Sequence, residues 1–171
     1  MEGYTNFKKV YISGPFTFAA RPEEIMCFYE AIGDLCSNLG LVPYLPHRKT
    51  NPWNHPKVPP GEIFFTDKAE VQTSALVIAY VGEPSHGVGM ELAYAEMANI
   101  PVILLYEKDA KISRILRGIP TVVAEVTFSG KQEAILQLYE VITTMGRSGI
   151  TLACHDPVER REEGSTTIDV G

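Results

Sequence analysis

Long apolar runs are missing from this chain. No uninterrupted stretch approaches the roughly 20 apolar residues that a membrane-spanning helix needs. Residues 1–6 show no basic segment followed by an apolar one, the arrangement typical of a signal peptide. The sequence therefore predicts a protein that has no membrane partner and is located in the cytoplasm.

Cysteine is also scarce, with 3 residues in a chain of 171. Cys27, Cys36 and Cys154 form no CxxC pair, which indicates reduced packing residues rather than a disulfide framework or a zinc site. The 4 histidines, at positions 47, 55, 86 and 155, show no metal-ligand spacing either. We therefore expect no bound metal and no cofactor.

Positive charge is in the minority, because 15 lysines and arginines face 21 aspartates and glutamates, for a net charge of −6. A broad nucleic-acid footprint needs a basic surface. Nucleic acid is therefore not an expected partner, although the net charge does not exclude a local basic pocket. Hydrophobic residues make up 45% of the 171 residues, which is ordinary for one globular domain with a sizeable core.

Apolar segments alternate along the chain with segments of helical periodicity. The expected strands cover residues 8–13, 41–45, 75–81, 101–106 and 121–128, and the expected helices cover 22–39, 61–74, 90–99, 111–117 and 131–145. This alternation predicts a parallel sheet with right-handed crossovers. We expect an α/β fold, a single doubly wound domain of the flavodoxin-like or Rossmann-like kind, with a five-stranded parallel sheet flanked by helices.

Prolines distinguish the segments 41–45 and 46–60, and the alternation of strands and helices ends after residue 146. Pro43 cannot donate to a ladder on both sides, so the strand at 41–45 is expected at an edge of the sheet. Residues 46–60 hold five prolines and are expected to form a long loop. The catalytic domain is assigned to residues 1–146, and residues 147–171 are expected to be a flexible, solvated tail.

Ligands in such sheets bind beyond the carboxyl ends of the strands, where the strand order reverses. This rule places residues 13–17, the pair His47 and Arg48, and residues 85–91 around one crevice.

The segment 83–92 connects an apolar strand to a helix through small residues. Gly87 and Gly89 would let an anion approach the backbone at the positive end of the helix dipole, and Ser85 adds a hydroxyl donor. The glycines alone fit a flexible connection equally well. No Gly-Lys-Ser/Thr follows, and Leu92 stands where a dinucleotide fingerprint needs a third small residue. We predict a phosphate site that is neither a P-loop nor a dinucleotide fingerprint.

Two carboxylates accompany this segment. Glu91 is expected in the first turn of the helix, where a carboxylate often only complements the dipole, but its small neighbours leave it reachable as a nucleophile or base. Asp67 lies inside the helix expected at 61–74, where aspartate is unfavourable unless it is solvated or functional. Two carboxylates near one crevice are the usual set for breaking a glycosidic bond.

Four other side chains are weaker candidates by position alone. Tyr11 on the first strand fits packing, Ser113 fits an exposed hydroxyl or a helix cap, and His86 fits the rim of the crevice. Trp53, in the proline-rich segment, would either cover a base or pin the loop.

Two runs of the chain resemble the nucleoside 2-deoxyribosyltransferase superfamily. They are Val10-Tyr11-Ile12-Ser13-Gly14-Pro15-Phe16 and Pro84-Ser85-His86-Gly87-Val88-Gly89-Met90-Glu91-Leu92, in which a serine stands six residues before the glutamate. The resemblance covers residues 8–145. It is closest to the 2′-deoxynucleoside 5′-monophosphate N-glycosidases and the related cytidine monophosphate hydrolases of nucleoside-antibiotic pathways.

The resemblance implies catalytic roles for three residues. Glu91 would attack C1′ of the sugar and displace the base, Asp67 would protonate or orient the leaving base, and Tyr11 would position the sugar and the nucleophile. The physical chemistry agrees, because N-glycosidic cleavage builds positive charge on the sugar and negative charge on the base.

The resemblance also implies a binding site for a small-molecule nucleotide. Ser85 matches a serine that contacts the phosphate, where transferases acting on free nucleosides tend to carry an acidic residue. Ser113 matches a serine that reaches the phosphate of the neighbouring subunit, which implies a homodimer with composite sites. The other predicted contacts are Ser13, Gly14, Phe16, His47, Arg48, Gly87 and Gly89.

The sequence departs from the family pattern after Gly14. The deoxynucleotide hydrolases often carry an Arg-Gly-Gly stretch there, and this chain has Pro15-Phe16-Thr17. Residues 47–53 look more like the cytidylate hydrolase branch. Tyr11, where that branch can have phenylalanine, favours deoxyribose.

The resulting hypothesis is hydrolysis of the N-glycosidic bond of a nucleoside 5′-monophosphate, preferably a deoxyribonucleotide. The products would be a free base and a (deoxy)ribose 5-phosphate, formed through a covalent intermediate on Glu91. Base exchange by a nucleoside 2-deoxyribosyltransferase is one alternative, and Ser85 argues against it. A nucleotide-binding module without activity is another, and the joint presence of Glu91, Asp67 and Tyr11 argues against that one.

Overall fold

The strands of this protein form one parallel sheet in the computed structural model, which describes residues 8–16, 19, 21–50 and 55–147. The strand order is β2-β1-β3-β4-β5, and all pairs are parallel. This is the flavodoxin-like order, so the predicted doubly wound α/β fold with a five-stranded parallel sheet is confirmed. The strands are β1 (Lys9–Ser13), β2 (Val42–Tyr44), β3 (Leu76–Tyr80), β4 (Val102–Glu107) and β5 (Val122–Phe128).

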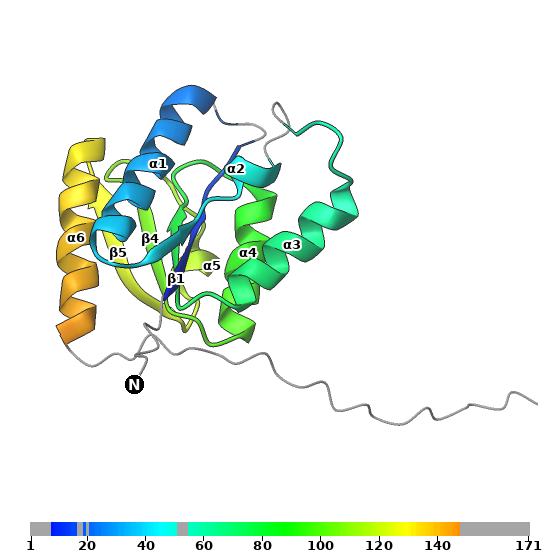
Figure 1. Ribbon diagram of the computed structural model, residues 1–171. Helices are drawn as coiled ribbons and strands as arrows, with labels where there is room; N and C mark the ends of the chain where they lie inside the picture. Colours follow the sequence, from blue (N-terminus) through cyan, green and yellow to red (C-terminus); the bar gives the residue numbers. More distant parts are fainter. Residues whose placement is uncertain (1–7, 17–18, 20, 51–54, 148–171) are drawn as a thin grey trace, which may run out of the picture.

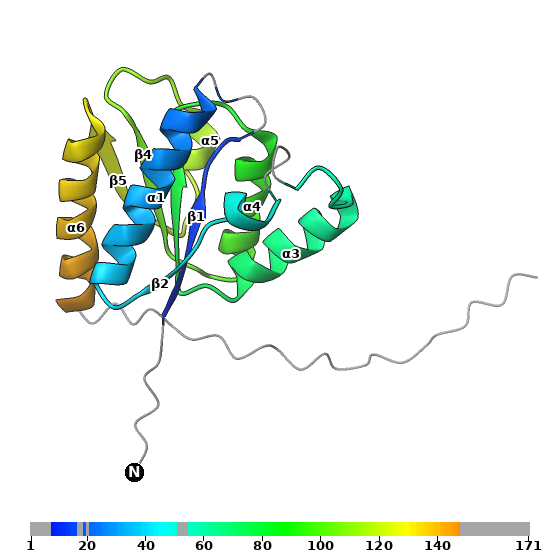
Figure 2. The ribbon, with the colours of Figure 1, turned by 45° about the horizontal axis from the view of Figure 1, so that its top comes forward.

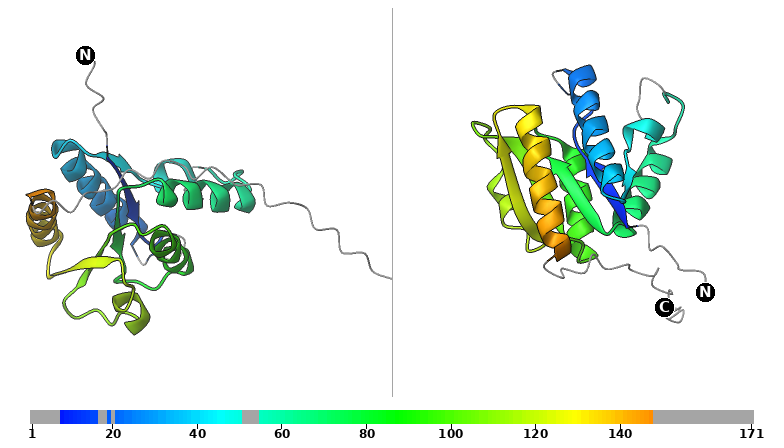
Figure 3. Two further views of the ribbon diagram at one scale, coloured as in Figure 1. Left: turned by 90° about the horizontal axis from the view of Figure 1, so that it is seen from below. Right: turned by 60° about the vertical axis from the view of Figure 1, so that its left-hand side comes forward.

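Helices cover both faces of the sheet, as Figures 1 and 3 show. Two of them, α1 and α6, pack on one face, and α3, α4 and the short α5 lie on the other. Among the described segments, no helix combines the length and the apolar character needed to cross a membrane. The bounds of these helices are α1 (Pro22–Asn38), α3 (Pro60–Gln72), α4 (His86–Met97), α5 (Arg114–Arg117) and α6 (Lys131–Arg147).

Each face of the sheet has its own apolar core. Val10 and Ile12 of β1 belong to the core under α1 and α6, whereas Tyr11 belongs to the core under α3 and α4. Side chains alternate between the faces along a strand, so β1 directs Tyr11 and Ser13 to the α4 side. This alternation puts their hydroxyl groups within reach of α4.

Local capping signals account for the bounds of α1. Pro22 opens the helix, and Glu23 and Glu24 in its first turn complement the helix dipole. Behind the helix end stands Gly40, whose φ of 74° lies in the left-handed region that favours glycine. The sequence prediction for this helix is therefore close to the observed bounds.

Helix α4 begins earlier than the sequence predicted. It starts at His86 rather than at residue 90, because Ser85 takes the N-cap position and its Oγ accepts a hydrogen bond from Val88 N. Gly87 and Gly89 therefore belong to the helix, and the predicted small-residue turn is in fact the first turn of α4.

Two further segments differ from the prediction. A short helix, α2 (His47–Thr50), stands in the stretch that was expected to be a loop. Helix α5 covers only the second half of the helix expected at 111–117. Trp53, Thr17, Cys154, His155 and residues 148–171 of the predicted tail lie outside the described residues.

The strand order reverses at β1. The chain passes from β1 to β2 on one side of it and later to β3 on the other, where Ser13 pairs with Ala79. Figure 2 shows β1 running between α1 and α4. Doubly wound sheets bind ligands at such a switch point, so the site is expected at the carboxyl ends of β1 and β3.

Candidate active site

A cavity of about 630 Å³ opens beyond the carboxyl ends of β1 and β3. The segment after β1 lines it with Gly14, Pro15 and Phe16, and the first turn of α4 lines it as well. Asp67 of α3 and Glu91 of α4 both contribute to its surface. The structure thus brings the two predicted carboxylates into one crevice at the switch point.

Glu91 reaches this cavity from the second turn of α4, not from the first turn, because the helix begins at His86. Tyr11 donates its hydroxyl to Glu91 Oε1 at 2.9 Å, and the Ser13 hydroxyl donates to Glu91 Oε2. Tyr11 and Ser13 stand two residues apart on β1, so they share one face of the sheet. Both carboxylate oxygens are thereby oriented by a central strand.

The surroundings of Glu91 favour its protonated form. Its pKa is raised to about 7, mainly by burial and in part by the charge of Asp67, although the hydrogen bonds from Ser13 and Tyr11 lower it. Burial also raises the pKa of Tyr11 well above its usual range, so Tyr11 keeps its proton and stays a donor. Carboxyl groups that change charge near neutral pH are frequent among catalytic groups.

Asp67 faces the cavity from the interior of α3. Its pKa is raised to about 6, mainly by burial and in part by the charge of Glu70. Its Oδ1 atom is buried without a hydrogen-bond partner among the described residues. Buried polar atoms are normally paired, so this oxygen calls for a donor from a bound molecule or from water. Asp67 is therefore not the solvated aspartate that the sequence left open.

Tyr44 is a neighbour of this site that the sequence did not indicate. Its ring stacks on that of Tyr11, with the centroids 5.5 Å apart. Its hydroxyl is also buried without a partner among the residues described, and burial followed by the charge of Asp67 raises its pKa. The sequence contained no signal for this role, because a tyrosine on an edge strand usually serves packing alone.

Ser85, Gly87 and Gly89 line the cavity at the first turn of α4. Ser85 Oγ accepts a hydrogen bond from Val88 N at 3.4 Å, so its hydroxyl proton is available to a ligand. A Cβ at Gly89 would meet no atom within 4 Å, which means that packing does not demand glycine there. The backbone of this turn is open to an anion at the positive end of the helix dipole.

Gly14 and Phe16 form the wall of the cavity that follows β1. A Cβ at Gly14 would lie 2.1 Å from Tyr29 Oη, so glycine permits the close passage of this segment beside α1. The Phe16 ring packs edge-on against Tyr29 at a centroid distance of 5.4 Å and lies 5.5 Å from the His47 ring. Phe16 thus presents a supported aromatic surface to the cavity.

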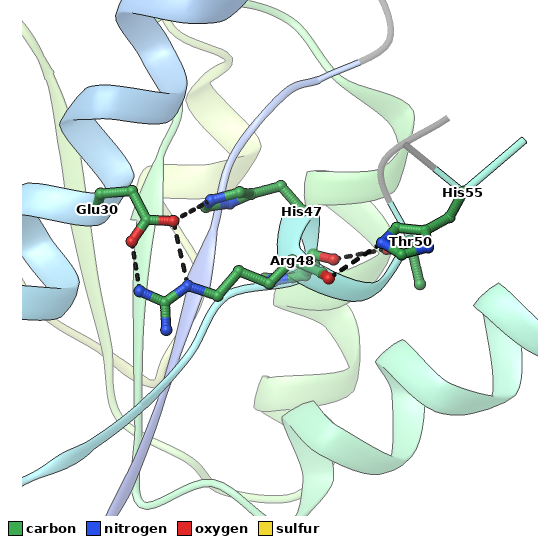
Figure 4. Close-up of polar contacts among 6 residues, drawn as sticks. Glu30, His47, Arg48, Thr50 and His55 are labelled. Atoms are coloured by element: carbon green, nitrogen blue, oxygen red, sulfur yellow. Dashed lines mark hydrogen bonds and ion pairs between the residues drawn. The ribbon is translucent and has the colours of Figure 1, made fainter. Parts of the chain in front are cut away.

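His47 and Arg48 do not line the cavity, although both were predicted substrate contacts. Figure 4 shows them bound to Glu30 of α1 instead. His47 Nε2 lies 2.6 Å and Arg48 Nε 3.1 Å from Glu30 Oε1, and Arg48 Nη2 bonds to Glu30 Oε2. Arg48 is the largest cause of the lowered pKa of Glu30, and His47 also lowers it. These contacts fasten α2 to α1.

The segment between β4 and α5 lines the cavity with Lys111, Ile112 and Ser113. Ser113 is exposed at the N-cap position of α5 and makes no side-chain cap hydrogen bond. It lies at the cavity of its own chain, and its reach into a neighbouring subunit stays a prediction. Lys111 was missed, although its place just beyond an apolar strand was a usable signal. Other lining residues that were not predicted include Pro46, Thr50, Ile63, Glu83 and Leu116.

The arrangement combines two carboxyl groups of raised pKa with a helix N-terminus that is open to an anion. Within the described part of the chain, no group of histidine, cysteine, aspartate and glutamate side chains could hold a metal ion. A carboxylate held by two hydroxyl donors beside a second carboxyl group suits attack on an anomeric carbon and proton transfer to a leaving group.

A family model for nucleoside 2-deoxyribosyltransferase matches residues 10–159 of this chain. The chain belongs to this family. The match begins on β1 and continues past the end of α6, so it includes the cavity and also enters the segment that was predicted to be a tail.

Curated relatives match shorter stretches. A 2′-deoxynucleoside 5′-phosphate N-hydrolase 1 of Syntrophotalea carbinolica is 39% identical over 62 residues, which are 35% of this chain and 44% of the relative. One of Methanosarcina mazei is 33% identical over 82 residues, which are 48% of this chain and 51% of the relative. The chain therefore spans about half the length of the curated relatives that it matches.

Solved structures share the fold at lower identity. BlsM has a TM-score of 0.67 and 22% identity, with coverage of 91% of this chain and 98% of BlsM. The CMP N-glycosidase BcmB of Clostridium botulinum has a TM-score of 0.62 and 18% identity, with coverage of 78% of this chain and 99% of BcmB. These two likenesses show the fold alone.

Proposed function

We propose that this protein hydrolyses the N-glycosidic bond of a nucleoside 5′-monophosphate, preferably a deoxyribonucleotide, and releases the free base and a (deoxy)ribose 5-phosphate. The observation that carries the proposal is the carboxylate of Glu91, which shares the cavity with Asp67 and is oriented by Tyr11 and Ser13. The names of the curated relatives support the substrate class. Membership of the deoxyribosyltransferase family supports chemistry at the anomeric carbon.

The proposed reaction has two steps at C1′. In the first, a carboxylate oxygen of Glu91 forms a bond to C1′ while the C1′–N bond breaks, and the bonding electrons leave with the base. Asp67 in its protonated form gives its proton to the leaving base. In the second step, water attacks C1′, the glycosyl ester releases the Glu91 carboxylate, and the water proton returns to Asp67. The configuration at C1′ is retained.

This mechanism needs one proton on the pair of carboxyl groups. Glu91 must be ionised to attack, and Asp67 must be protonated to act as an acid. Their pKa values of about 7 and about 6 are close, and the charge of Asp67 raises the pKa of Glu91, so the two titrate as a coupled pair. Because Glu91 has the higher pKa, most of this proton lies on Glu91, and the form with ionised Glu91 and protonated Asp67 is the minor one. Both forms of the singly protonated pair are most abundant between these two pKa values, which is where we expect the highest activity.

The phosphate of the substrate is proposed to bind at the first turn of α4, at Ser85, Gly87 and Gly89. Binding energy from the phosphate, remote from the bond that breaks, would then hold the sugar over Glu91. The proposed preference for deoxyribose is based on Tyr11, whose hydroxyl donates a hydrogen bond to Glu91 Oε1.

We also propose a cytoplasmic homodimer in which Ser113 reaches the phosphate bound by the neighbouring subunit. The exposure of Ser113 supports this proposal, because its hydroxyl is accessible. Light scattering on the purified protein tests the dimer, and Ser113→Ala should weaken monophosphate binding. A monomer at micromolar concentration, or an unchanged affinity in the variant, would count against the composite site.

The deciding experiment incubates the protein with each ribo- and deoxyribonucleoside monophosphate and measures the released base by chromatography. Base release without an added acceptor supports hydrolysis. Product that forms only with a second free base would identify the alternative, a nucleoside 2-deoxyribosyltransferase, and binding without turnover would identify a nucleotide-binding module. Glu91→Gln should abolish turnover and keep nucleotide binding, whereas Glu140→Gln, an exposed change on α6, is the matched control.

A further inference from the structure

Negative charge dominates the side chains that line the cavity. Asp67, Glu83 and Glu91 carry carboxyl groups, and Lys111 is the one residue of permanent positive charge among the described lining residues. Lys111 is exposed and stands between β4 and α5, two residues before Ser113. The positive charge of Lys111 contrasts with the carboxyl groups of the other charged lining residues. In the function proposed above, the phosphate of the substrate would be its partner.

Arg48, which was a predicted substrate contact, is already paired with a carboxylate. The guanidinium of Arg48 bonds to both carboxylate oxygens of Glu30, and Arg48 does not line the cavity. The segment after β1 contributes Gly14, Pro15 and Phe16, which carry no side-chain charge. Among the described residues that line the cavity, Lys111 is therefore the permanent counter-charge for an anionic ligand.

A phosphate monoester carries a charge of about −1.5 to −2 at pH 7. Such a group is repelled by ionised carboxylates in the same cavity, since two unit charges interact across several ångströms even near a protein surface. The N-terminal turn of α4 offers backbone donors but only about half a positive charge. A full positive charge on the opposite segment offsets more of this repulsion and favours a phosphorylated sugar over a neutral one.

We propose that Lys111 is the specificity-determining residue of this cavity, which binds the 5′-phosphate of the substrate and selects a nucleotide over a free nucleoside. The proposal rests on the proposed function and adds a residue and a selection rule to it. The ammonium group contributes charge rather than fixed geometry, so Lys111→Arg keeps the selection and Lys111→Met loses it.

The test measures binding of 2-deoxyribose 5-phosphate and of 2-deoxyribose by titration calorimetry, without any requirement for turnover. Lys111→Met should weaken binding of the sugar phosphate about tenfold, the typical effect of losing a charge-assisted contact, and Lys111→Arg should restore it. The matched control is Lys108→Met in the same segment, because Lys108 Nζ pairs with Glu133 Oε1 at 2.8 Å and does not line the cavity.

The salt dependence of binding is a second readout. Wild-type affinity for the sugar phosphate should fall as ionic strength rises, and the slope should be smaller in Lys111→Met. Equal affinity of Lys111→Met and wild type for the sugar phosphate would overturn the proposal, and so would equal weakening by Lys108→Met. A wild-type protein that does not bind the sugar phosphate would overturn it as well.

Failure of this proposal is distinguishable from failure of the proposed function. Base release from a monophosphate with an unchanged preference for nucleotide over nucleoside in Lys111→Met would refute the role of Lys111 alone. Loss of sugar phosphate binding in Lys111→Met, without base release from any nucleotide by the wild type, would refute the hydrolase and keep the role of Lys111.

Discussion

The Glu91→Gln substitution should stabilise this protein, and the gain should grow with pH. Burial raises the pKa of Glu91 from 4.5 to about 7, so the folded protein binds the proton more tightly than the unfolded chain does. The stability associated with protonated Glu91 is complete below pH 4.5, is lost as pH rises through 7, and stays lost above that. Glutamine has nearly the same shape and carries no charge, so it avoids this loss.

The size of the effect follows from the shift in pKa. A rise of about 2.5 units corresponds to an upper limit of about 3.4 kcal/mol in the free energy of unfolding. Glu91 keeps part of its surface in the open cavity, and screening by water there lowers the value. We therefore expect the stability of Glu91→Gln relative to wild type to increase by about 1 to 2.5 kcal/mol between pH 5 and pH 8.

Urea denaturation of both proteins at pH 5, 6, 7 and 8 measures this difference. Glu140→Gln on the exposed side of α6 serves as control and should show no change in relative stability over this interval. Equal stability of Glu91→Gln relative to wild type at pH 5 and at pH 8 would contradict this expectation, because the charge of Glu91 would then not destabilise the folded state.

Other substitutions test separate parts of the site. Tyr11→Phe removes the donor to Glu91 Oε1, so the pKa of Glu91, the higher of the pair, should rise. The alkaline limb of the kcat/KM–pH profile should then move up by roughly one unit, and an unmoved limb contradicts the contact. Asp67→Asn removes the proton given to the base, and base release should fall by roughly 10² to 10⁴ with loss of the alkaline limb. Gly14→Ala brings a Cβ against Tyr29 Oη and should lower the free energy of unfolding by about 1 to 3 kcal/mol. Gly89→Ala meets no atom within 4 Å and should raise it by about 0.5 to 1 kcal/mol in the same denaturation assay.

Residue order was sufficient for most of the fold. Apolar runs alternate along the chain with segments of helical periodicity, so the parallel sheet could be predicted. The edge position of β2 could be predicted as well, because Pro43 cannot donate a hydrogen bond to a neighbouring strand. The early start of α4 at Ser85 could also have been found, because a serine N-cap is a local signal. Its two glycines instead favoured the prediction of a turn.

Glu91 and Asp67 could be named from the sequence, because acidic residues beside a strand end or inside a helix stand out by position and by family likeness. Their meeting in one cavity, and the pKa values that follow from burial there, depend on how α3 and α4 pack on the sheet. No local pattern encodes that packing.

The tertiary structure also decided the partners of the charged side chains. Arg48 bonds to Glu30, 18 residues earlier in the chain, and is thereby withdrawn from the cavity. Lys111 enters the cavity wall, because the segment after β4 meets the first turn of α4 there. Charge pairing depends on distances between elements that are remote in sequence. The composition of the chain therefore gave the number of charged side chains, whereas the partner of each one depended on the fold.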